Sequence, residues 1–267
     1  MNWLDHLHFG KGVFVVGVLI VLMVLERKFP LVVVRFQLSR LGRNFSLAGL
    51  NIVLGPLIVI PITTLAVGLA LHWRPEWWSG WLGLGLDLLI LDCWIYIWHR
   101  LNHVVPFLWR FHEVHHLDET LDASSGLRFH FGEVVLSSLA RALVVFLLAV
   151  PFQNVVIFET LLTLAALFQH SNVRLAPGFE RALAYVIVTP SIHWVHHHAL
   201  RQDTDSNYST ILSLWDGVFR SRSLHKRDVD MKIGVEGFSD ERVTSSQCRA
   251  HISPKCGEAI KRSTTFS

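Results

Sequence analysis

The sequence predicts an all-α membrane protein that crosses the bilayer several times and carries a histidine-rich cap for two metal ions. Of its 267 residues, 51% are hydrophobic and 17% are charged, and the mean hydropathy is +0.41. Soluble domains average about 25% charged residues, so this composition lies outside the soluble norm. Several apolar stretches approach the roughly 20 residues that a membrane helix needs. We therefore expect about four to five hydrophobic helices in a multi-pass integral membrane protein.

The first two apolar stretches predict membrane segments. Residues 13–25 lack a small-residue cleavage pattern, so we expect this stretch to stay in the membrane rather than to act as a signal peptide. Residues 45–71 are interrupted by Gly55-Pro56 and by Pro61, which membrane helices tolerate as kinks.

Three further apolar stretches follow. Residues 77–98 end at the first histidine motif, while 134–150 and 152–168 are hinged at Pro151. At 1.5 Å per residue each half of this hairpin reaches about 25 Å, so we expect it to be tilted or to cross incompletely. A short apolar piece, 182–188, leads into the last histidine motif.

Charge predicts the orientation and the domain division. The connection after the first stretch is rich in Arg and Lys, whereas the connection after the second has only Arg74 and Glu76. By the positive-inside rule the first connection is cytoplasmic, and every histidine motif then falls on the cytoplasmic face, at the inner membrane if the source is bacterial. We expect a membrane-embedded domain over 1–223, with its motif core at 92–219, and a polar cytoplasmic tail over 224–267.

Histidines recur at spacings that suit metal ligation. Residues at i, i+3 and i+4 share one face of a helix, so each HxxHH motif is expected to aim three nitrogens at one point. Imidazole suits zinc, copper, iron and nickel, and the three cysteines form no CxxC pair. With eight imidazoles available, two metals is the simpler count. The eight are His99, His103, His112, His115, His116, His193, His196 and His197.

An acid lies on the same helical stripe as two of these histidines. Asp92, Tyr96, His99 and His103 are spaced i, i+4, i+7 and i+11. An unpartnered acid inside an apolar span costs several kcal/mol, so Asp92 is a candidate functional residue. It either accepts a hydrogen bond from a ligating imidazole or makes a hydrogen bond between helices. Asp87 is off the stripe, and we interpret it as structural.

These motifs together resemble the fatty acid hydroxylase/sterol desaturase superfamily. The resemblance covers about residues 92–219. It departs at Phe131, where the family usually has Pro, at Ser209, where Gly is common, and in the tail from about Ser239. The matching runs are Asp92 to His103, Leu108 to His116, Arg128-Phe129-His130 with Glu133, Gln169-His170-Ser171-Asn172, Thr189-Pro190 before His193 to His197, Asn207-Tyr208, and Leu214-Trp215-Asp216 with Phe219.

The resemblance implies a membrane-bound non-haem di-iron oxygenase. Such enzymes use two histidine-ligated irons, O2 and two electrons to hydroxylate or desaturate a C–H bond of a lipid, here a sterol, a fatty acyl or sphingoid chain, a carotenoid or an alkylglycerol. The resemblance adds His170 and His130 as candidate metal ligands. His170 is otherwise a capping or packing residue. His130 is otherwise either a group near the substrate or a group that supports a metal ligand, with Arg128 and Glu133 paired around it. Asp92, Tyr96, Arg128, Glu133 and Asn172 are the expected catalytic residues.

The expected partners are a lipid, the membrane and a separate electron donor, with no nucleic acid. No cysteine or haem motif for an electron-transfer domain is present, so a ferredoxin or a cytochrome with its reductase would supply electrons. The basic connection, with Arg35, Arg40 and Arg43, and the basic tail are candidate docking surfaces, although topology alone explains the same charges.

Other classes use histidine in related ways. A metal transporter would place its ligands near the midplane of the spans. A zinc hydrolase would show HExxH, but the histidine after His112-Glu113 falls at i+3. Fatty acyl desaturases of the other histidine-box family have a different motif order. A non-catalytic or zinc-binding membrane protein that uses the same cluster stays open as the alternative.

Overall fold

The computed structural model describes residues 3–34, 37–71 and 73–237. The predicted tail beyond residue 237 and the expected docking residue Arg35 lie outside these ranges. In the described ranges all regular elements are helical, apart from three isolated β-bridges. They are α1 (Trp3–Lys28), α2 (Leu38–Leu54), the π-helical η1 (Gly55–Val59), α3 (Ile60–Gly68), α4 (Gly80–Val104), α5 (Pro106–His116), the 3-10 helix η2 (Ala123–Leu127), α6 (Phe131–Leu148), α7 (Phe152–His170), α8 (Pro177–Leu183), α9 (Pro190–His196), α10 (Arg201–Thr204) and α11 (Leu214–Val218).

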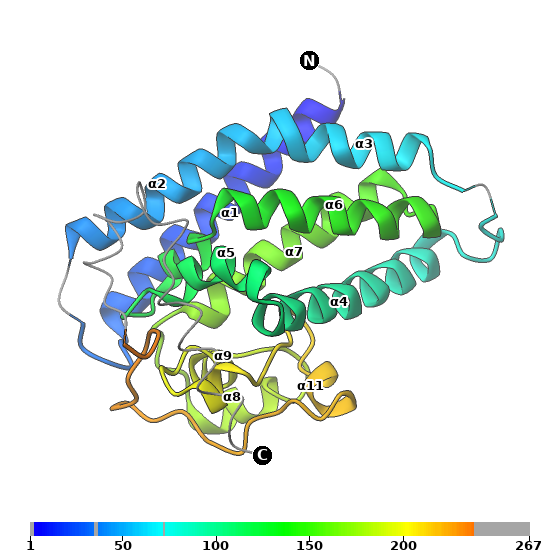
Figure 1. Cartoon of the computed structure of the whole chain (residues 1–267). Helices are drawn as coiled ribbons and strands as arrows, with labels where there is room; N and C mark the ends of the chain where they lie inside the picture. Colours follow the sequence, from blue (N-terminus) through cyan, green and yellow to red (C-terminus); the bar gives the residue numbers. More distant parts are fainter. Residues whose placement is uncertain (1–2, 35–36, 72, 238–267) are drawn as a thin grey trace.

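Four helical stretches are long and apolar enough to cross a membrane: 38–68, 80–104, 131–148 and 152–170. This confirms the predicted all-α, multi-pass architecture. Helix α1 packs along α7, and its exposed residues include Val13, Phe14 and Ile20. Figure 1 shows α2, η1 and α3 as one long rod above α6, with α4 below α6.

The two predicted irregularities have specific forms. At Gly55-Pro56 the helix does not break but continues from α2 to α3 through the π-helical turn η1. Proline lacks a backbone N–H, and one wider turn accommodates it without ending the helix. The turn between α6 and α7 uses the left-handed Ala149 (φ 51°) before Pro151. At 18 and 19 residues these two helices measure about 27 and 28 Å, close to the hydrocarbon thickness.

A buried ion pair closes the end of the bundle away from the histidines. Arg74 Nη2 donates to both carboxylate oxygens of Asp87, at 2.6 and 2.7 Å. Trp78 Nε1 and Asn154 Nδ2 also donate to Asp87. Trp73, Trp77 and Trp81 are exposed beside it, as a tryptophan belt at a membrane interface would be. Asp87 therefore joins the α3–α4 connection to the start of α7.

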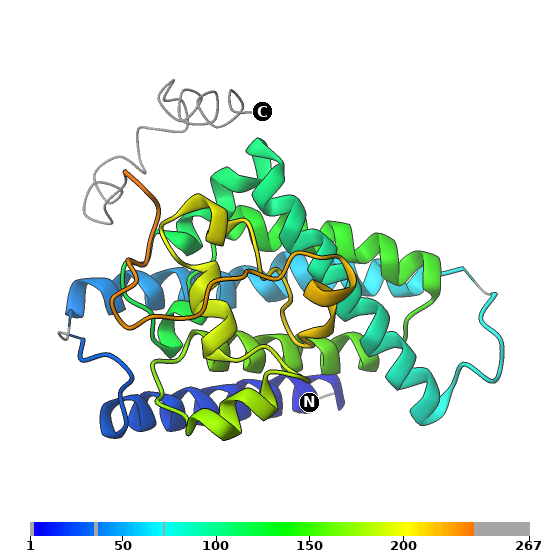
Figure 2. The same ribbon diagram turned by 90° about the horizontal axis from the view of Figure 1, so that it is seen from below.

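The opposite end of the bundle carries the histidines. His99 and His103 lie in the last two turns of α4, His170 ends α7, and α5 and α9 pack between them. The chain from α8 to α11 gathers on one side of the bundle, and within it α11 lies beside α4 (Figures 1 and 2). An apolar core that includes Leu91, Trp98, Val155 and Phe158 fills the space between α4 and α7 and fixes this arrangement.

Candidate metal centre

Nine buried histidines form two compact groups. Within each group one ring nitrogen per histidine lies within 4.8 Å of the others. Helices α4, α5, α7 and α9 contribute to them, so sequence-distant motifs converge. The first histidine group is His99, His103, His112, His116 and His196, and the second is His115, His170, His193 and His197.

Each HxxHH motif is divided between the two groups. On α5, His112 and His116 belong to the first group and His115 to the second. In the last motif His196 belongs to the first group, while His193 and His197 belong to the second. Positions i and i+4 differ by about 40° around a helix, but i+3 and i+4 differ by about 100°. The expectation that each motif aims three nitrogens at one point is therefore wrong: it serves two points.

The second group has the spacing of a metal site. His170 Nε2 lies 3.0 Å from His115 Nε2, 3.0 Å from His193 Nε2 and 3.1 Å from His197 Nε2. The His193–His197 Nε2 distance is also 3.1 Å. Nitrogens bound at about 2.1 Å to one ion, at angles of 90–109°, lie about 3.0–3.4 Å apart. The donor spacing fits a single four-coordinate metal or one with further open positions.

Hydrogen bonding at this group also calls for a cation. His115 Nδ1 donates to the Arg128 carbonyl at 3.1 Å, and His170 Nδ1 donates to the Ala166 carbonyl at 2.6 Å. A neutral imidazole that donates through Nδ1 has only a lone pair on Nε2. Two such lone pairs face each other across 3.0 Å between His115 and His170. A positive ion between them resolves this contact, so the residues fit a metal.

The first group fits a second metal. His112 Nε2 and His116 Nε2 are 3.2 Å apart, and the His99 and His196 rings are 4.6 Å apart. Both ring nitrogens of His103 and Nε2 of His196 are buried without a hydrogen-bond partner. Such groups are costly to bury unless something binds them.

The tautomers of three first-group histidines are fixed from outside. His99 Nδ1 donates to the Tyr208 carbonyl at 2.8 Å, and His196 Nδ1 donates to the Ser206 carbonyl at 2.6 Å. His112 Nδ1 lies 2.8 Å from Glu133 Oε1. Metal-binding histidines commonly donate their other N–H to a carbonyl or carboxylate, which turns the free lone pair towards the ion.

Burial favours the neutral form of five histidines outside the membrane-spanning helices. It lowers the pKa of His115, His116, His193 and His197 well below the usual 6.5, and neighbouring imidazoles lower the pKa of each further. For His196, burial lowers the pKa to about 3 despite its hydrogen bond to Ser206. A neutral imidazole is the form that ligates a metal.

Asp92 makes hydrogen bonds between chain segments rather than to an imidazole. Its carboxylate accepts from the Ile211 and Leu212 amides at 3.2 and 3.1 Å and from Trp215 Nε1 at 2.8 Å. Of the two roles that the sequence leaves open, the structure matches the packing role. Asp92 fixes the segment that supplies the Tyr208 carbonyl to His99.

Tyr96 belongs to the same connection. Its hydroxyl is 2.8 Å from Ser221 Oγ, and its ring stacks on Phe219. Asp216 completes this part of the structure by accepting from the Tyr208 and Ser209 amides.

Arg128 and Glu133 both contact histidine ligand candidates. The Arg128 carbonyl orients His115, while its Nε donates to the Val114 carbonyl at 2.7 Å. Glu133 pairs with His112 and accepts from Asn102 Nδ2 at 3.3 Å.

His130 lies outside both histidine groups. It is the N-cap of α6, and its Nδ1 accepts from the Gly132 amide at 3.0 Å. Its side chain contacts Phe111 and Phe131. The structure therefore brings His170, but not His130, to the clustered imidazoles.

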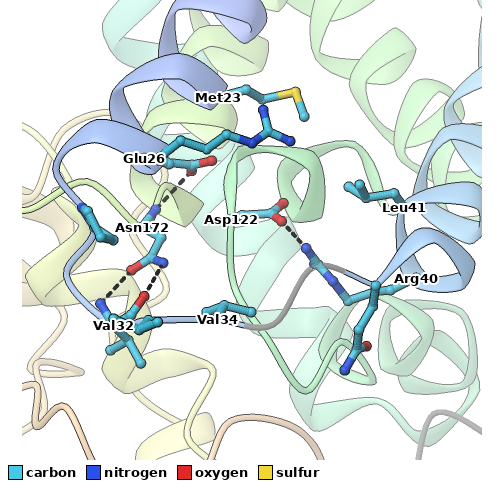
Figure 3. Close-up of a pocket in the computed structure, with 12 residues that line it drawn as sticks. Met23, Glu26, Val32, Val34, Arg40, Leu41, Asp122 and Asn172 are labelled. Atoms are coloured by element: carbon cyan, nitrogen blue, oxygen red, sulfur yellow. Dashed lines mark hydrogen bonds and ion pairs between the residues drawn. The ribbon is translucent and has the colours of Figure 1, made fainter.

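Asn172 lies two residues after His170 and lines a pocket of about 260 Å³ between the ends of α1 and α2. The Asn172 side chain accepts from the Val32 backbone N–H and donates to the Val32 carbonyl. The backbone N–H of Asn172 donates to Glu26 Oε1 at 2.9 Å (Figure 3). Glu26 also accepts from the Ala123 amide, at the start of η2. The sequence indicated Asn172 only by resemblance and did not single out Glu26, because an acid beside Arg27 and Lys28 looks like a solvated helix end.

Arg40 is not a surface residue for docking. It is buried and pairs with Asp118 and Asp122, and it donates to the Thr120 carbonyl at 2.8 Å. A guanidinium in this position braces the loop between α5 and η2 (Figure 3). The expected basic docking surface therefore loses one of its three residues to the interior.

Two polar clusters were not predicted from the sequence. Arg201 donates to the His103 carbonyl and pairs with Asp205, which lies 3.4 Å from His103 Nδ1. Inside the bundle, Glu159 pairs with Arg141 at 2.7 Å and with Lys11 at 3.3 Å. The intramembrane charges Arg141 and Glu159 were visible in the sequence as single charges in apolar runs, but their pairing depends on helix packing.

The fold and the site define a multi-pass membrane protein with two buried polyhistidine groups that can each bind metal. Residues 84–221, half of the chain, match the sequence model of the fatty acid hydroxylase family. The chain belongs to this family. No solved structure matches it.

Three relatives illustrate the range of the family. The ornithine lipid hydroxylase OlsE of Rhizobium tropici is 27% identical over 182 residues, 68% of this chain and 54% of the relative. Human alkylglycerol monooxygenase is 29% identical over 150 residues, 54% of this chain and 29% of the relative. A cholesterol 25-hydroxylase-like protein of Danio rerio is 28% identical over 137 residues, 51% of this chain and 53% of the relative. The chain thus spans about half the length, or less, of these relatives.

Proposed function

We propose that this protein is an O2-dependent lipid hydroxylase that holds two irons at its histidine groups. The observation that carries the proposal is the convergence of nine buried histidines into two groups at one end of a membrane bundle, in a chain of the fatty acid hydroxylase family. His99, His103, His112, His116 and His196 would hold one iron, and His115, His170, His193 and His197 the other.

The bound irons would supply the redox chemistry that activates O2 towards an unactivated C–H bond, which acid–base side chains alone do not attack. The chain supplies the rest. Burial excludes water from the imidazoles, while Tyr208, Arg128 and Glu133 hold three of the rings in the ligating tautomer. Because these partners come from three different segments, the donor set is preorganised by the fold.

The overall reaction consumes electrons from outside the chain. Hydroxylation is balanced as R–H + O2 + 2e⁻ + 2H⁺ → R–OH + H2O, whereas desaturation removes two hydrogens from the lipid and forms two waters. We favour hydroxylation because the relatives are named as hydroxylases and monooxygenases. The electron donor is a separate ferredoxin or a cytochrome with its reductase.

The substrate we propose is a membrane lipid with a hydrocarbon portion that enters from the bilayer. The names of the relatives point to an ornithine lipid, an alkylglycerol and a sterol as the first compounds to compare. The positive-inside rule supports a cytoplasmic histidine centre, because Arg27 and Lys28 end α1 on the side where α4 and α7 carry their histidines. That side gives soluble reductants access.

The test is metal content together with oxygen incorporation. Protein purified from iron-supplemented cells is analysed for metals, reduced in nanodiscs with each lipid under ¹⁸O2, and the lipids are examined by mass spectrometry. We expect about two irons per chain and one ¹⁸O in a product. In His196→Ala we expect the iron content to fall to about one per chain and the labelled product to be lost. Zinc alone, together with lipid turnover that needs no O2, would instead support the hydrolase alternative.

A further inference from the structure

One part of the histidine-rich cap lies beside the apolar span of α4 rather than past its end. Asp92 is twelve residues before the end of α4 at Val104, about 18 Å along the helix axis. Its hydrogen bonds to Ile211, Leu212 and Trp215 hold the C-terminal segment at that level of α4. In both views α11 lies beside α4 and not past its end (Figures 1 and 2).

The backbone of this segment is hydrogen-bonded between residues 186–188 and residues 211–213. Ile187 and Leu212 form an antiparallel bridge, Val188 N donates to the Ile211 carbonyl at 2.9 Å, and Ser213 N donates to the Val186 carbonyl at 3.1 Å. Non-helical backbone at membrane depth is tolerated only where its polar groups are satisfied. This short ladder, together with Asp92, meets that condition at these positions.

The outer side of this segment is apolar and exposed. Tyr185 is 76% exposed, Val186 60% and Val218 61%, and Leu214 and Phe219 are exposed beside them. Single exposed apolar residues are ordinary, but these five gather on one ladder and the helix that follows it. We call Tyr185, Val186, Leu214, Val218 and Phe219 the lipid rim.

We propose that the lipid rim is a re-entrant element seated among the acyl chains of the leaflet nearest the histidine centre. Acyl chains are the occupant because α11 lies beside α4, a helix long and apolar enough to cross a membrane, on which Leu89 and Ile97 are also exposed. The exposed Arg220 follows the rim directly, and the rim in this position would let its long side chain extend towards the headgroups.

The rim also borders the first histidine group. Phe219 stacks on Tyr96 with ring centroids 4.9 Å apart, and Tyr96 is three residues from His99 on α4. Acyl chains at the rim would therefore lie against the wall of that group. This places lipid beside the metal centre without crossing the polar cap.

Spin-label accessibility in nanodiscs tests the proposal. Cys93, Cys248 and Cys256 are replaced by Ser, and single labels are placed at Tyr185→Cys, Val186→Cys and Val218→Cys. Leu143→Cys on α6 is the matched lipid control, and Gln202→Cys on α10 is the aqueous control, since both positions are exposed. Each label is measured for collision with O2 and with a water-soluble nickel chelate.

We expect the ratio of O2 to nickel collision at the three rim positions to match that at Leu143 and to exceed that at Gln202. A ratio like that of Gln202 would place the rim in water and overturn the proposal. Low collision with both reagents would also overturn it, because the rim would then be covered by protein, for instance a second copy of the chain. The measurement needs no turnover, so its outcome is independent of the proposed reaction.

Discussion

Glu133 Oε1 lies 2.8 Å from His112 Nδ1. Glu133 lies in the first turn of α6, and His112 lies on α5. The pair joins a membrane helix to the cap at the first histidine group. A carboxylate in this position fixes the tautomer and the orientation of the imidazole ring.

Glu133→Ala should weaken iron binding or activity about 10- to 100-fold, the range seen when the hydrogen-bond partner of a metal ligand is lost. Glu133→Gln should lose less, because its amide oxygen still accepts the His112 N–H. Iron retained against a graded chelator series, read beside turnover, separates the two variants. Equal iron retention in wild type and Glu133→Ala would contradict the role assigned to this pair.

The two buried acids of α4 should differ in their effect on metal content. Asp92→Asn leaves donors from Ile211, Leu212 and Trp215 poorly matched, and each unsatisfied buried group costs about 1–3 kcal/mol. Because this segment presents the Tyr208 carbonyl to His99, we expect a lower melting temperature and a fall from about two irons towards one.

Asp87→Asn is the matched control. It disturbs a comparable buried acid at the far end of α4, where Arg74 and Asn154 are its partners. We expect a lower melting temperature with both irons retained. If the two variants lost iron equally, the loss in Asp92→Asn would reflect general destabilisation.

The helices and the histidine spacing were predictable because both depend on local sequence. Apolar length predicted the four stretches that are long enough to cross a membrane. The two HxxHH motifs and the HxxxH motif identified eight of the nine clustered imidazoles. The division of each motif between two groups was not predicted, although positions i+3 and i+4 differ by about 100° around a helix and so point in different directions. The spacing says which side chains are neighbours on one helix, not how a second helix meets them.

Long-range partners were not predictable from spacing. Asp92 meets Ile211 and Trp215, more than a hundred residues away, and Arg40 meets Asp118 across the bundle. A charge count placed Arg40 on a docking surface because hydropathy treats every Arg as solvated. Only tertiary packing decides which charge is buried with a partner.

The variants His170→Ala and His130→Ala should differ in iron content. His170 Nε2 lies within 3.1 Å of three other Nε2 atoms, whereas His130 caps α6 through the Gly132 amide. We expect His170→Ala to lose about one iron per chain. His130→Ala should keep both irons and lose about 0.5–2 kcal/mol of stability as a weakened helix cap. Elemental analysis and thermal melts check this, and comparable iron loss in both variants would make His130 a ligand.

The metal-free protein should be destabilised by mild acid. Burial lowers the pKa of His116, His193 and His197 well below 6.5 and that of His196 to about 3. Below pH 6.5 the unfolded chain binds protons that the folded chain does not, so acid favours unfolding, whereas above pH 6.5 both states are neutral and this effect vanishes.

Each such histidine costs about 1.4 kcal/mol per pH unit as the pH falls from 6.5 towards its folded pKa. Thermal melts of chelator-treated protein should therefore change little between pH 8 and 7 and fall steeply from pH 6.5 to 5. His196→Gln removes one of these groups, so its melting temperature should fall less steeply over the same interval. Parallel curves for wild type and His196→Gln would mean that His196 is already protonated in the folded protein or open to water, and the buried neutral imidazole required for metal binding would be absent.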